Sequence, residues 1–162
     1  MNLTKENMEL QDYVSSIVKA QREKRFNDSP QLSLGKLISE FERFDLRDSQ
    51  DEIKTVRFDF GSAIPSTLDS YRGSYDELAL GYKLTGYDNN EGHFDECKAD
   101  EFVKHLKEAI GKEYTGWKGG EYIMRENTPV WVANSGNSGS TGIMGVIDNG
   151  YEFIIITGHC EF

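Results

Sequence analysis

The sequence predicts an α+β fold: a mainly antiparallel sheet covered by about two helices, with an N-terminal helical appendage. Three observations support this prediction. Apolar residues recur at helical spacing before residue 45 and again near residue 100, they alternate with polar ones over residues 56–60, and short apolar runs separated by turn residues follow residue 120. The 162 residues, 37% of them hydrophobic, suffice to bury one core. We therefore divide the chain into a helical extension, residues 1–30, and a single α+β domain, residues 31–162.

Three helices are predicted in this order. The first covers about residues 4–25, and Pro30 follows its end because proline disfavours a helical conformation in the residue before it. Ser33 is a natural cap for a second helix over about residues 34–43, and a third covers about residues 98–110, ending at Gly111. We expect the first helix either to dock on the domain or to mediate self-association, of which docking is the commoner outcome.

Strands make up most of the remainder. The alternation over residues 56–60 predicts one strand with a single buried face, and residues 78–84 are interpreted as a second. Residues 61–75 and 86–96 are predicted to be loops. Four further strands are expected over residues 121–124, 129–133, 143–147 and 151–157. Asn149 and Gly150 are expected to form a tight hairpin turn in which both residues take positive φ.

Charge narrows the range of partners. Twenty-eight acidic and 18 basic residues give a net charge of −10, which disfavours direct binding to nucleic acid or to an anionic membrane. The excess is greatest over residues 51–100, where eleven acids face five bases. Such a surface can attract a basic protein, or it can serve only to keep the protein in solution. The candidate partner-binding acidic residues are Asp88, Glu91, Asp95 and Glu96.

Two clusters of aromatic and cationic residues between glycines are candidate ligand-binding sites. In both, rings can stack on a ligand while guanidinium or ammonium groups hold a phosphate or carboxylate. The alternative is that the rings fill the core and the cations tie down loops. The candidate ligand-binding residues are Tyr71, Arg72 and Tyr75 in the first cluster, and Lys112, Tyr114, Trp117 and Lys118 in the second.

Several chemistries lack their sequence signature. Cys97 and Cys160 are far apart and are interpreted as reduced thiols, and the cysteine and histidine spacing predicts no zinc site. The sequence has no phosphate-binding P-loop, no EF-hand and no G-x-S-x-G esterase motif, and it indicates no cofactor. It also lacks a long apolar run and an apolar N-terminal leader, so we expect a cytoplasmic protein with no membrane contact.

Several phrases of the sequence resemble a group of small, mostly uncharacterised proteins encoded by bacteriophages. The resemblance covers roughly residues 31–150. It rests on residues 58–60, on the run from Tyr71 to Tyr75 with Leu78-Ala79-Leu80, on Gly111-Lys112 with residues 116–120, and on Thr128-Pro129 leading to Trp131. It implies an accessory protein located in the cytoplasm of the host cell, and small accessory proteins of phages often bind a host protein or sequester a nucleotide signal.

The leading hypothesis is a small acidic, phage-type accessory protein that binds and antagonises a host factor, such as a defence component, without catalysis. One alternative is a sponge for a phosphorylated small ligand, in which Tyr71 or Trp117 stacks on a nucleotide. Another is a phosphodiesterase or hydrolase that uses Arg72 and one of the three histidines. The sequence also leaves open a structural component of the virion.

Overall fold

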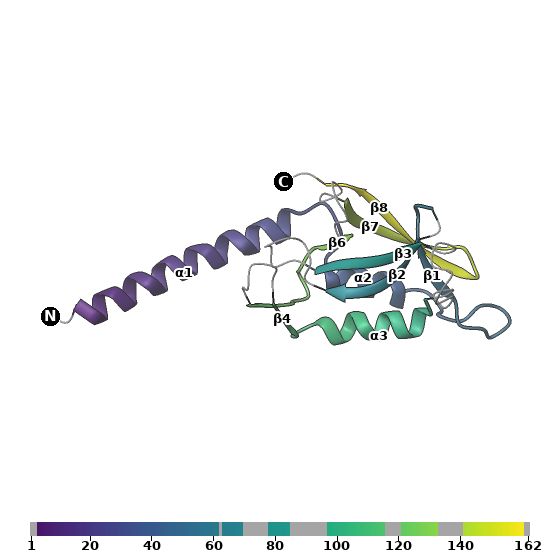
Figure 1. Ribbon diagram of the computed structural model, residues 1–162, viewed down its shortest axis with the longest axis horizontal. Coiled ribbons are helices and arrows are strands. Elements are labelled where there is room, and N and C mark those ends of the chain that lie inside the picture. The colour runs from purple at the N-terminus through teal and green to yellow at the C-terminus, as the bar shows by residue number, and fades with distance from the viewer. Residues whose placement is uncertain are drawn as a thin grey trace.

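The computed structural model describes residues 3–61, 63–69, 78–84, 97–115, 121–132 and 141–160, and it has an α+β fold (Figure 1). The described elements, in chain order, are α1 (Leu3–Asp28), α2 (Leu34–Glu42), β1 (Thr55–Phe58), β2 (Ala63–Asp69), β3 (Leu78–Leu84), α3 (Ala99–Ala109), β4 (Glu113–Thr115), β5 (Glu121–Ile123), β6 (Val130–Val132), β7 (Thr141–Asp148) and β8 (Glu152–His159).

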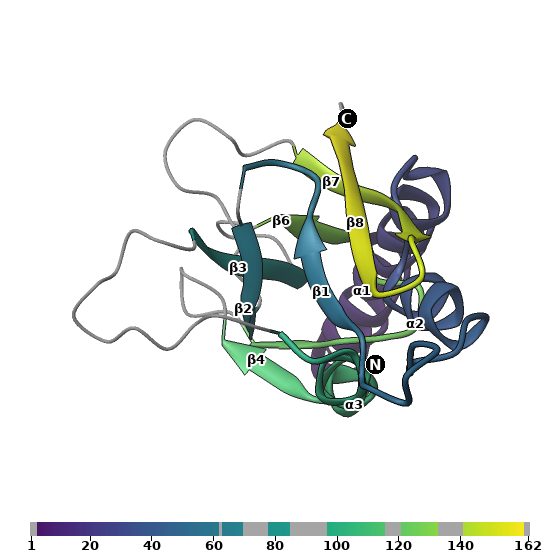
Figure 2. The ribbon, with the colours of Figure 1, turned by 90° about the vertical axis from the view of Figure 1, so that its right-hand side faces the viewer.

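Six strands form one sheet in the order β1-β8-β7-β6-β3-β2, and β4 and β5 form a separate antiparallel pair. Three of the five pairings in the large sheet are antiparallel, but β1 pairs with β8 and β3 pairs with β6 in parallel. The sheet is therefore mixed, with antiparallel pairings in the majority. Its two edge strands, β1 and β2, lie side by side, so the sheet curls almost into a barrel (Figure 2).

Helices α2 and α3 pack together and cover the sheet through their apolar faces. The predicted cap of α2 is confirmed, since the Ser33 hydroxyl accepts a hydrogen bond from the Lys36 amide at 3.3 Å. Phe41 of α2 joins the layers: its ring centroid lies 5.4 Å from that of Phe102 in α3 and 5.0 Å from that of Phe153 in β8, with both pairs edge to face. Such contacts between buried rings stabilise the fold beyond the area that they bury.

The predicted alternation in the first strand is confirmed. Val56 and Phe58 of β1 are buried, whereas Arg57 between them is partly exposed. The strand ends at Phe58 instead of residue 60, and the ring of Phe60 stacks on that of Phe58 at 5.1 Å. The end of the third helix is also as expected, because Gly111 has a φ of +81° and follows Ile110, the C-cap residue of α3.

The segment between α1 and α2 contributes to the sheet. The Leu32 amide donates a hydrogen bond of 2.7 Å to the Ile143 carbonyl, and the Leu32 carbonyl accepts one of 3.1 Å from the Val130 amide. Strands β6 and β7 pair directly at Trp131 and Gly142, so Leu32 adds to the link between them. The chain leaving α1 is thereby fixed to the centre of the sheet.

Two strands were not predicted. Residues 63–69 form edge strand β2, although 61–75 were predicted to be a loop. Pro65, which suggested a loop, is tolerated because it lies beside a register shift in an edge strand, where a missing amide donor costs little. Strand β4, Glu113–Thr115, was also not predicted, because glycine-rich sequence around it indicated a binding loop.

The hairpin between β7 and β8 is present, but its turn differs from the predicted one. Gly150 has a φ of +102°, whereas Asn149 does not take positive φ. The Asn149 side-chain oxygen instead accepts hydrogen bonds from the amides of Tyr151 and Glu152 at 3.1 and 2.8 Å. A side chain that binds the backbone ahead of it stabilises a turn without the left-handed conformation at that residue.

Helix α1 extends away from the body, the name used here for residues 31–160 (Figure 1). Among the described residues, the contacts that anchor it lie in its last part. Phe26 is buried, the Arg125 guanidinium carbon lies 5.2 Å from the centre of its ring, and Arg125 also forms an ion pair with Glu23. The Asn127 side-chain amide donates to the same carboxylate at 2.6 Å. In the described part of the chain, no helix has the length and hydropathy needed to cross a bilayer.

Candidate functional site

Most of the residues singled out in the sequence lie outside the described ranges. These are Tyr71, Arg72, Tyr75, Trp117 and Lys118 among the ligand-binding candidates, and all four of the acidic candidates, Asp88, Glu91, Asp95 and Glu96. Lys112 and Tyr114 are described. The backbone of Lys112 forms the turn between α3 and β4, donating to the Ala109 carbonyl and accepting from the Met124 amide, and Tyr114 pairs with Tyr122 across β4 and β5.

The described residues provide a different acidic surface, at the end of the body opposite α1. Its first part is the acidic turn, residues 45–52, which follows α2 and contains four carboxylates and one arginine. The Asp48 carboxylate accepts hydrogen bonds from the Gln50 and Glu52 amides at 2.9 and 3.0 Å. Arg47 donates to the Asp51 carbonyl at 2.7 Å, and Asp51 takes a φ of +62°. These bonds restrain the turn although it is acidic.

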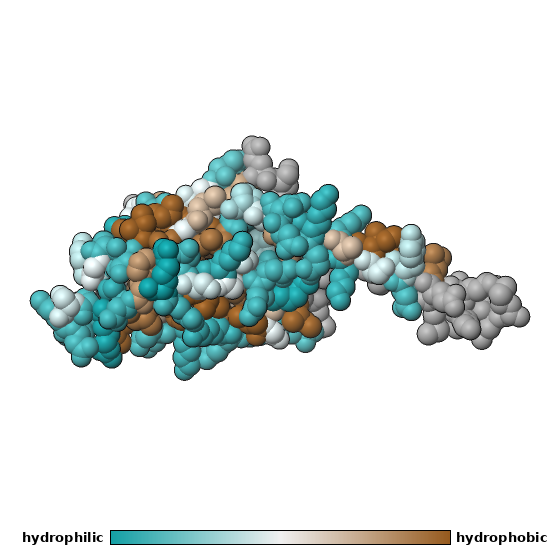
Figure 3. All heavy atoms as spheres, turned by 180° about the vertical axis from the view of Figure 1, so that it is seen from behind, coloured by the Kyte–Doolittle hydropathy of each residue, from teal (hydrophilic) through white to brown (hydrophobic). Residues whose placement is uncertain are grey.

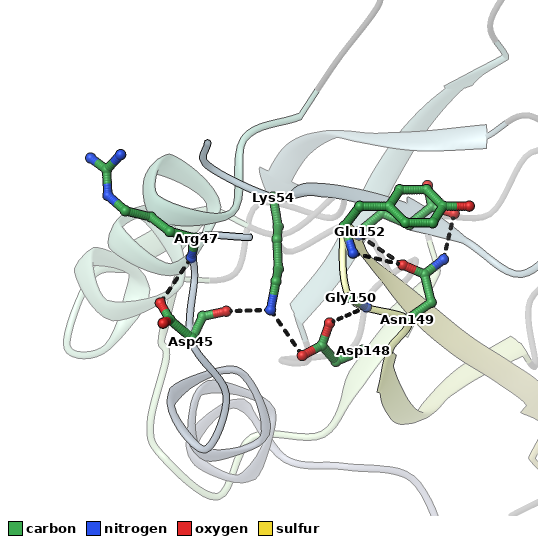
Figure 4. Close-up of polar contacts among 8 residues, drawn as sticks. Asp45, Arg47, Lys54, Asp148, Asn149, Gly150 and Glu152 are labelled. Carbon is green, nitrogen blue, oxygen red and sulfur yellow. Dashed lines mark hydrogen bonds and ion pairs between the residues drawn. The ribbon is translucent and has the colours of Figure 1, made fainter. Parts of the chain in front are cut away.

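The second part is the β7–β8 turn, residues 148–152 (Figure 4). The Asp148 carboxylate accepts a 2.9 Å hydrogen bond from the Gly150 amide. The Glu152 carboxylate accepts from the Asn149 side chain and from the Arg57 guanidinium, both at 3.0 Å. The side chains of Asp148, Asn149 and Glu152 therefore each bind the turn itself or a residue in or next to β1, and these bonds restrain the turn.

Lys54 joins the two turns (Figure 4). Its ammonium donates to the Asp45 carbonyl at 2.7 Å and to the Asp148 carboxylate at 2.9 Å, and it lies 5.3 Å from the centre of the Phe153 ring. The Lys54 side chain is 5% exposed. Burial raises the pKa of Asp148, but the Gly150 amide and the Lys54 charge outweigh it, and the pKa lies below its ordinary value of 3.8. The carboxylate is thus ionised at neutral pH.

An apolar surface adjoins these turns on the outward face of β7 and β8. Ile147 and Ile154 are cross-strand partners, whereas the neighbouring pair Val146 and Ile155 contributes to the core. Ile147 is 51% exposed. We call this surface the outer strip, and it consists of Met144, Ile147, Ile154 and Ile156. Hydrophobic residues at the surface of the body are visible in Figure 3. Tyr151, in the adjoining turn, is 65% exposed.

Among the described residues, a hollow of about 450 Å³ between Leu46 and α3 is one alternative place for a small ligand. Its charged residues are balanced, since Asp100 and Glu108 face Lys104 and Lys107. Lys107 forms a 2.7 Å ion pair with Glu42, and Lys104 lies 4.0 Å from Glu108. A phosphate would have to compete with these carboxylates for both ammonium groups. The hollow therefore does not have the net positive charge of a phosphate site.

The described residues contain no group of three or more histidine, cysteine, aspartate or glutamate side chains placed to hold a metal ion. Comparison of the chain with protein-family models, curated proteins and solved structures gave no significant match.

Both parts of this surface leave a signal in the sequence. The acidic turn is a run of charged residues, and the exposed Ile147 belongs to a strand in which apolar and polar residues alternate. The sequence alone could not predict that the two segments are neighbours in the fold, because Lys54 and Asp148, whose contact joins them, are 94 positions apart.

Proposed function

We propose that this protein binds a basic protein partner through the outer strip and the two acidic turns beside it, and that it acts as an antagonist of a host factor. The observation that carries the proposal is an exposed apolar strip beside acidic turns that hydrogen bonds restrain. Protein interfaces commonly combine an apolar, well-packed centre with a polar rim, and charge complementarity speeds and orients the encounter. The resemblance to phage accessory proteins supports the antagonist role.

The charges favour a basic partner. Residues 45–54 and 148–152 carry six carboxylates and two cations, and one of those cations, Lys54, is buried against Asp148. Asp45, Asp51 and Glu52 are exposed. A partner that places arginine or lysine residues around an apolar centre would match this surface. The hydrogen bonds that restrain both turns lower the entropy cost of binding.

The test is capture of partners from an extract of the cells that produce the protein, with three forms of the full chain. Ile147→Lys places a positive charge in the middle of the outer strip, and this charge would repel a basic partner. Ile123→Lys is the matched control, because Ile123 is 61% exposed and lies in β5, outside the strip. We expect the unmodified chain and the control to retain the same basic protein, and Ile147→Lys to lose it.

A direct measurement on the purified pair completes the test. We expect the affinity to fall with rising salt and to fall further when Asp51→Asn and Glu52→Gln are combined, because neutral residues remove the charge at similar size. Equal capture by Ile147→Lys and by the unmodified chain would refute the proposed surface. Binding of a nucleotide to the purified protein, with no protein partner, would instead favour the sponge.

A further inference from the structure

We infer that α1 is an association arm that pairs with α1 of a second copy of this chain, in antiparallel orientation. The helix has 26 residues and is about 39 Å long at 1.5 Å per residue. Its contacts with the body, described above, involve Glu23 and Phe26 near its C-terminal end. An isolated helix is marginally stable in water, so a projecting helix of this length gains stability from packing against a partner.

The described part of the arm has an exposed apolar stripe. Leu10, Tyr13, Val14 and Ile17 stand three, four and seven positions apart, which places them on one side of a helix. Their exposed fractions are 61%, 65%, 51% and 39%. Figure 3 shows hydrophobic residues along the arm beyond the body. Surface of this kind favours association in water, because burial of each large apolar side chain contributes about 1.5–3 kcal/mol.

The described residues of the body are not placed to cover the stripe. At about 100° per residue, Phe26, which anchors the helix, lies about 160° around the axis from Leu10 and about 180° from Ile17. The stripe therefore lies on the side of the helix opposite the anchor. A second molecule can reach and bury it there.

The charges of the arm select both the partner and the orientation. The first half of α1 contains Lys5 with three acids, and the second half contains four bases with two acids, of which Glu23 is engaged by Arg125. Antiparallel pairing of two copies places each acidic half beside a basic half, whereas parallel pairing places like charges together. Interaction with the helix dipole does not account for the whole pattern, since it acts within the terminal turns and Asp12 and Lys19 lie beyond them.

Antiparallel pairing has a geometric consequence. The body is joined to the C-terminal end of α1, so two antiparallel arms would hold their bodies at opposite ends of the paired helices (Figure 1). Both outer strips would remain outside the pairing. The inference is independent of the proposed function, because it uses different residues and a different partner.

The first test is the mass of the full chain in solution over a wide concentration range, measured by light scattering and sedimentation. We expect a monomer–dimer equilibrium in which the double variant Leu10→Ser, Ile17→Ser raises the dissociation constant by at least about 100-fold. Ile123→Ser, an exposed apolar residue in β5, is the control and should leave the constant unchanged. A monomer at every concentration, or a dimer insensitive to the double variant, would overturn the inference.

The second test distinguishes the two orientations with a charge-swapped arm. The swap replaces acids of the first half by lysine and bases of the second half by glutamate: Glu6→Lys, Glu9→Lys, Asp12→Lys, Lys19→Glu, Arg22→Glu, Lys24→Glu and Arg25→Glu. Antiparallel pairing predicts that the swapped chain still dimerises with itself and does not form mixed dimers with the unmodified chain, as seen by native mass spectrometry. Mixed dimers in excess of either parent would show parallel pairing and overturn the inference. Circular dichroism checks that the swapped arm is helical.

Discussion

The Lys54 ammonium and the Asp148 carboxylate form a 2.9 Å ion pair that connects the chain after α2 with the β7–β8 turn. The two partners are not equally buried, because the Lys54 side chain is 5% exposed and the Asp148 side chain is 16% exposed. Asp148 keeps a hydrogen bond from the Gly150 amide in addition to the ion pair. Loss of Asp148 therefore leaves a buried cation without its counter-ion, whereas loss of Lys54 leaves a carboxylate that still accepts a hydrogen bond.

Asp148→Asn should destabilise the protein more than Lys54→Met. The asparagine retains an acceptor for the Gly150 amide but leaves the Lys54 charge buried beside a neutral group, at a cost of about 3 kcal/mol. Lys54→Met leaves a partly exposed carboxylate that still accepts a hydrogen bond, at a cost of about 1–2 kcal/mol. Urea denaturation of both variants measures the order, and equal losses would contradict the asymmetry.

The same pair predicts the acid limb of stability. The pKa of Asp148 is below 3.8 in the folded protein, so the unfolded chain binds the proton first and the stability due to this group is lost as pH falls below about 4. Lys54→Met removes part of the cause of the lowered pKa. We expect its free energy of unfolding to fall less than that of the unmodified chain between about pH 5 and about pH 3. Identical slopes would show that the pair does not contribute.

Two glycines of β7 should differ in how much stability their replacement by alanine costs. A Cβ at Gly142 would lie 2.7 Å from the Cys160 sulfur and 3.0 Å from Cβ of Gln31, whereas a Cβ at Gly145 would have no neighbour within 4 Å among the described residues. Gly142→Ala should therefore cost about 1–3 kcal/mol from overpacking. Gly145→Ala is the matched control in the same strand and should cost less than about 0.5 kcal/mol. Thermal unfolding separates the two.

Cys97 should be slow to react while the protein is folded. Burial, and then the charge of Glu101, raise the pKa of its thiol to about 12, and the thiolate is the reactive form. Alkylation near neutral pH, followed by peptide mass spectrometry, should label Cys97 rapidly only in denaturant. The folded protein keeps the proton of this thiol up to a higher pH than the unfolded chain does. The free energy of unfolding should therefore decline as pH rises from about 9 toward 12, and Cys97→Ser should reduce that decline.

The sequence predicted the elements whose cause is local. The stripe and the Ser33 cap of α2, the left-handed Gly111 and the alternation around Arg57 each depend on residues a few positions apart, and each is present. Strand β2 was missed because Pro65 is tolerated only through its place at the sheet edge. The parallel pairs were missed because strand direction depends on residues far along the chain.

The candidate site likewise combines features that local sequence predicts with one that depends on distant residues. The acidic turn is visible as a charge run over residues 45–52, and the exposed Ile147 follows from alternation along β7. Their proximity depends on the Lys54 to Asp148 contact, which no local pattern indicates. The aromatic and cationic clusters predicted around Arg72 and Trp117, and the acidic candidates from Asp88 to Glu96, lie outside the described residues and stay predictions.

The parallel pairing of β1 with β8 also determines when the protein can fold during synthesis. Arg57 and its partner Glu152 are 95 positions apart, and β1 is an edge strand whose sheet partner is β8. Chains dominated by such distant pairings fold slowly, because loop closure precedes the contacts that reward it. On the ribosome, β1 must wait until β8 has left the exit tunnel. Until then β1 lacks its strand partner, and its apolar residues Val56 and Phe58 have no complete core to pack into. During this interval the nascent chain would depend on chaperones.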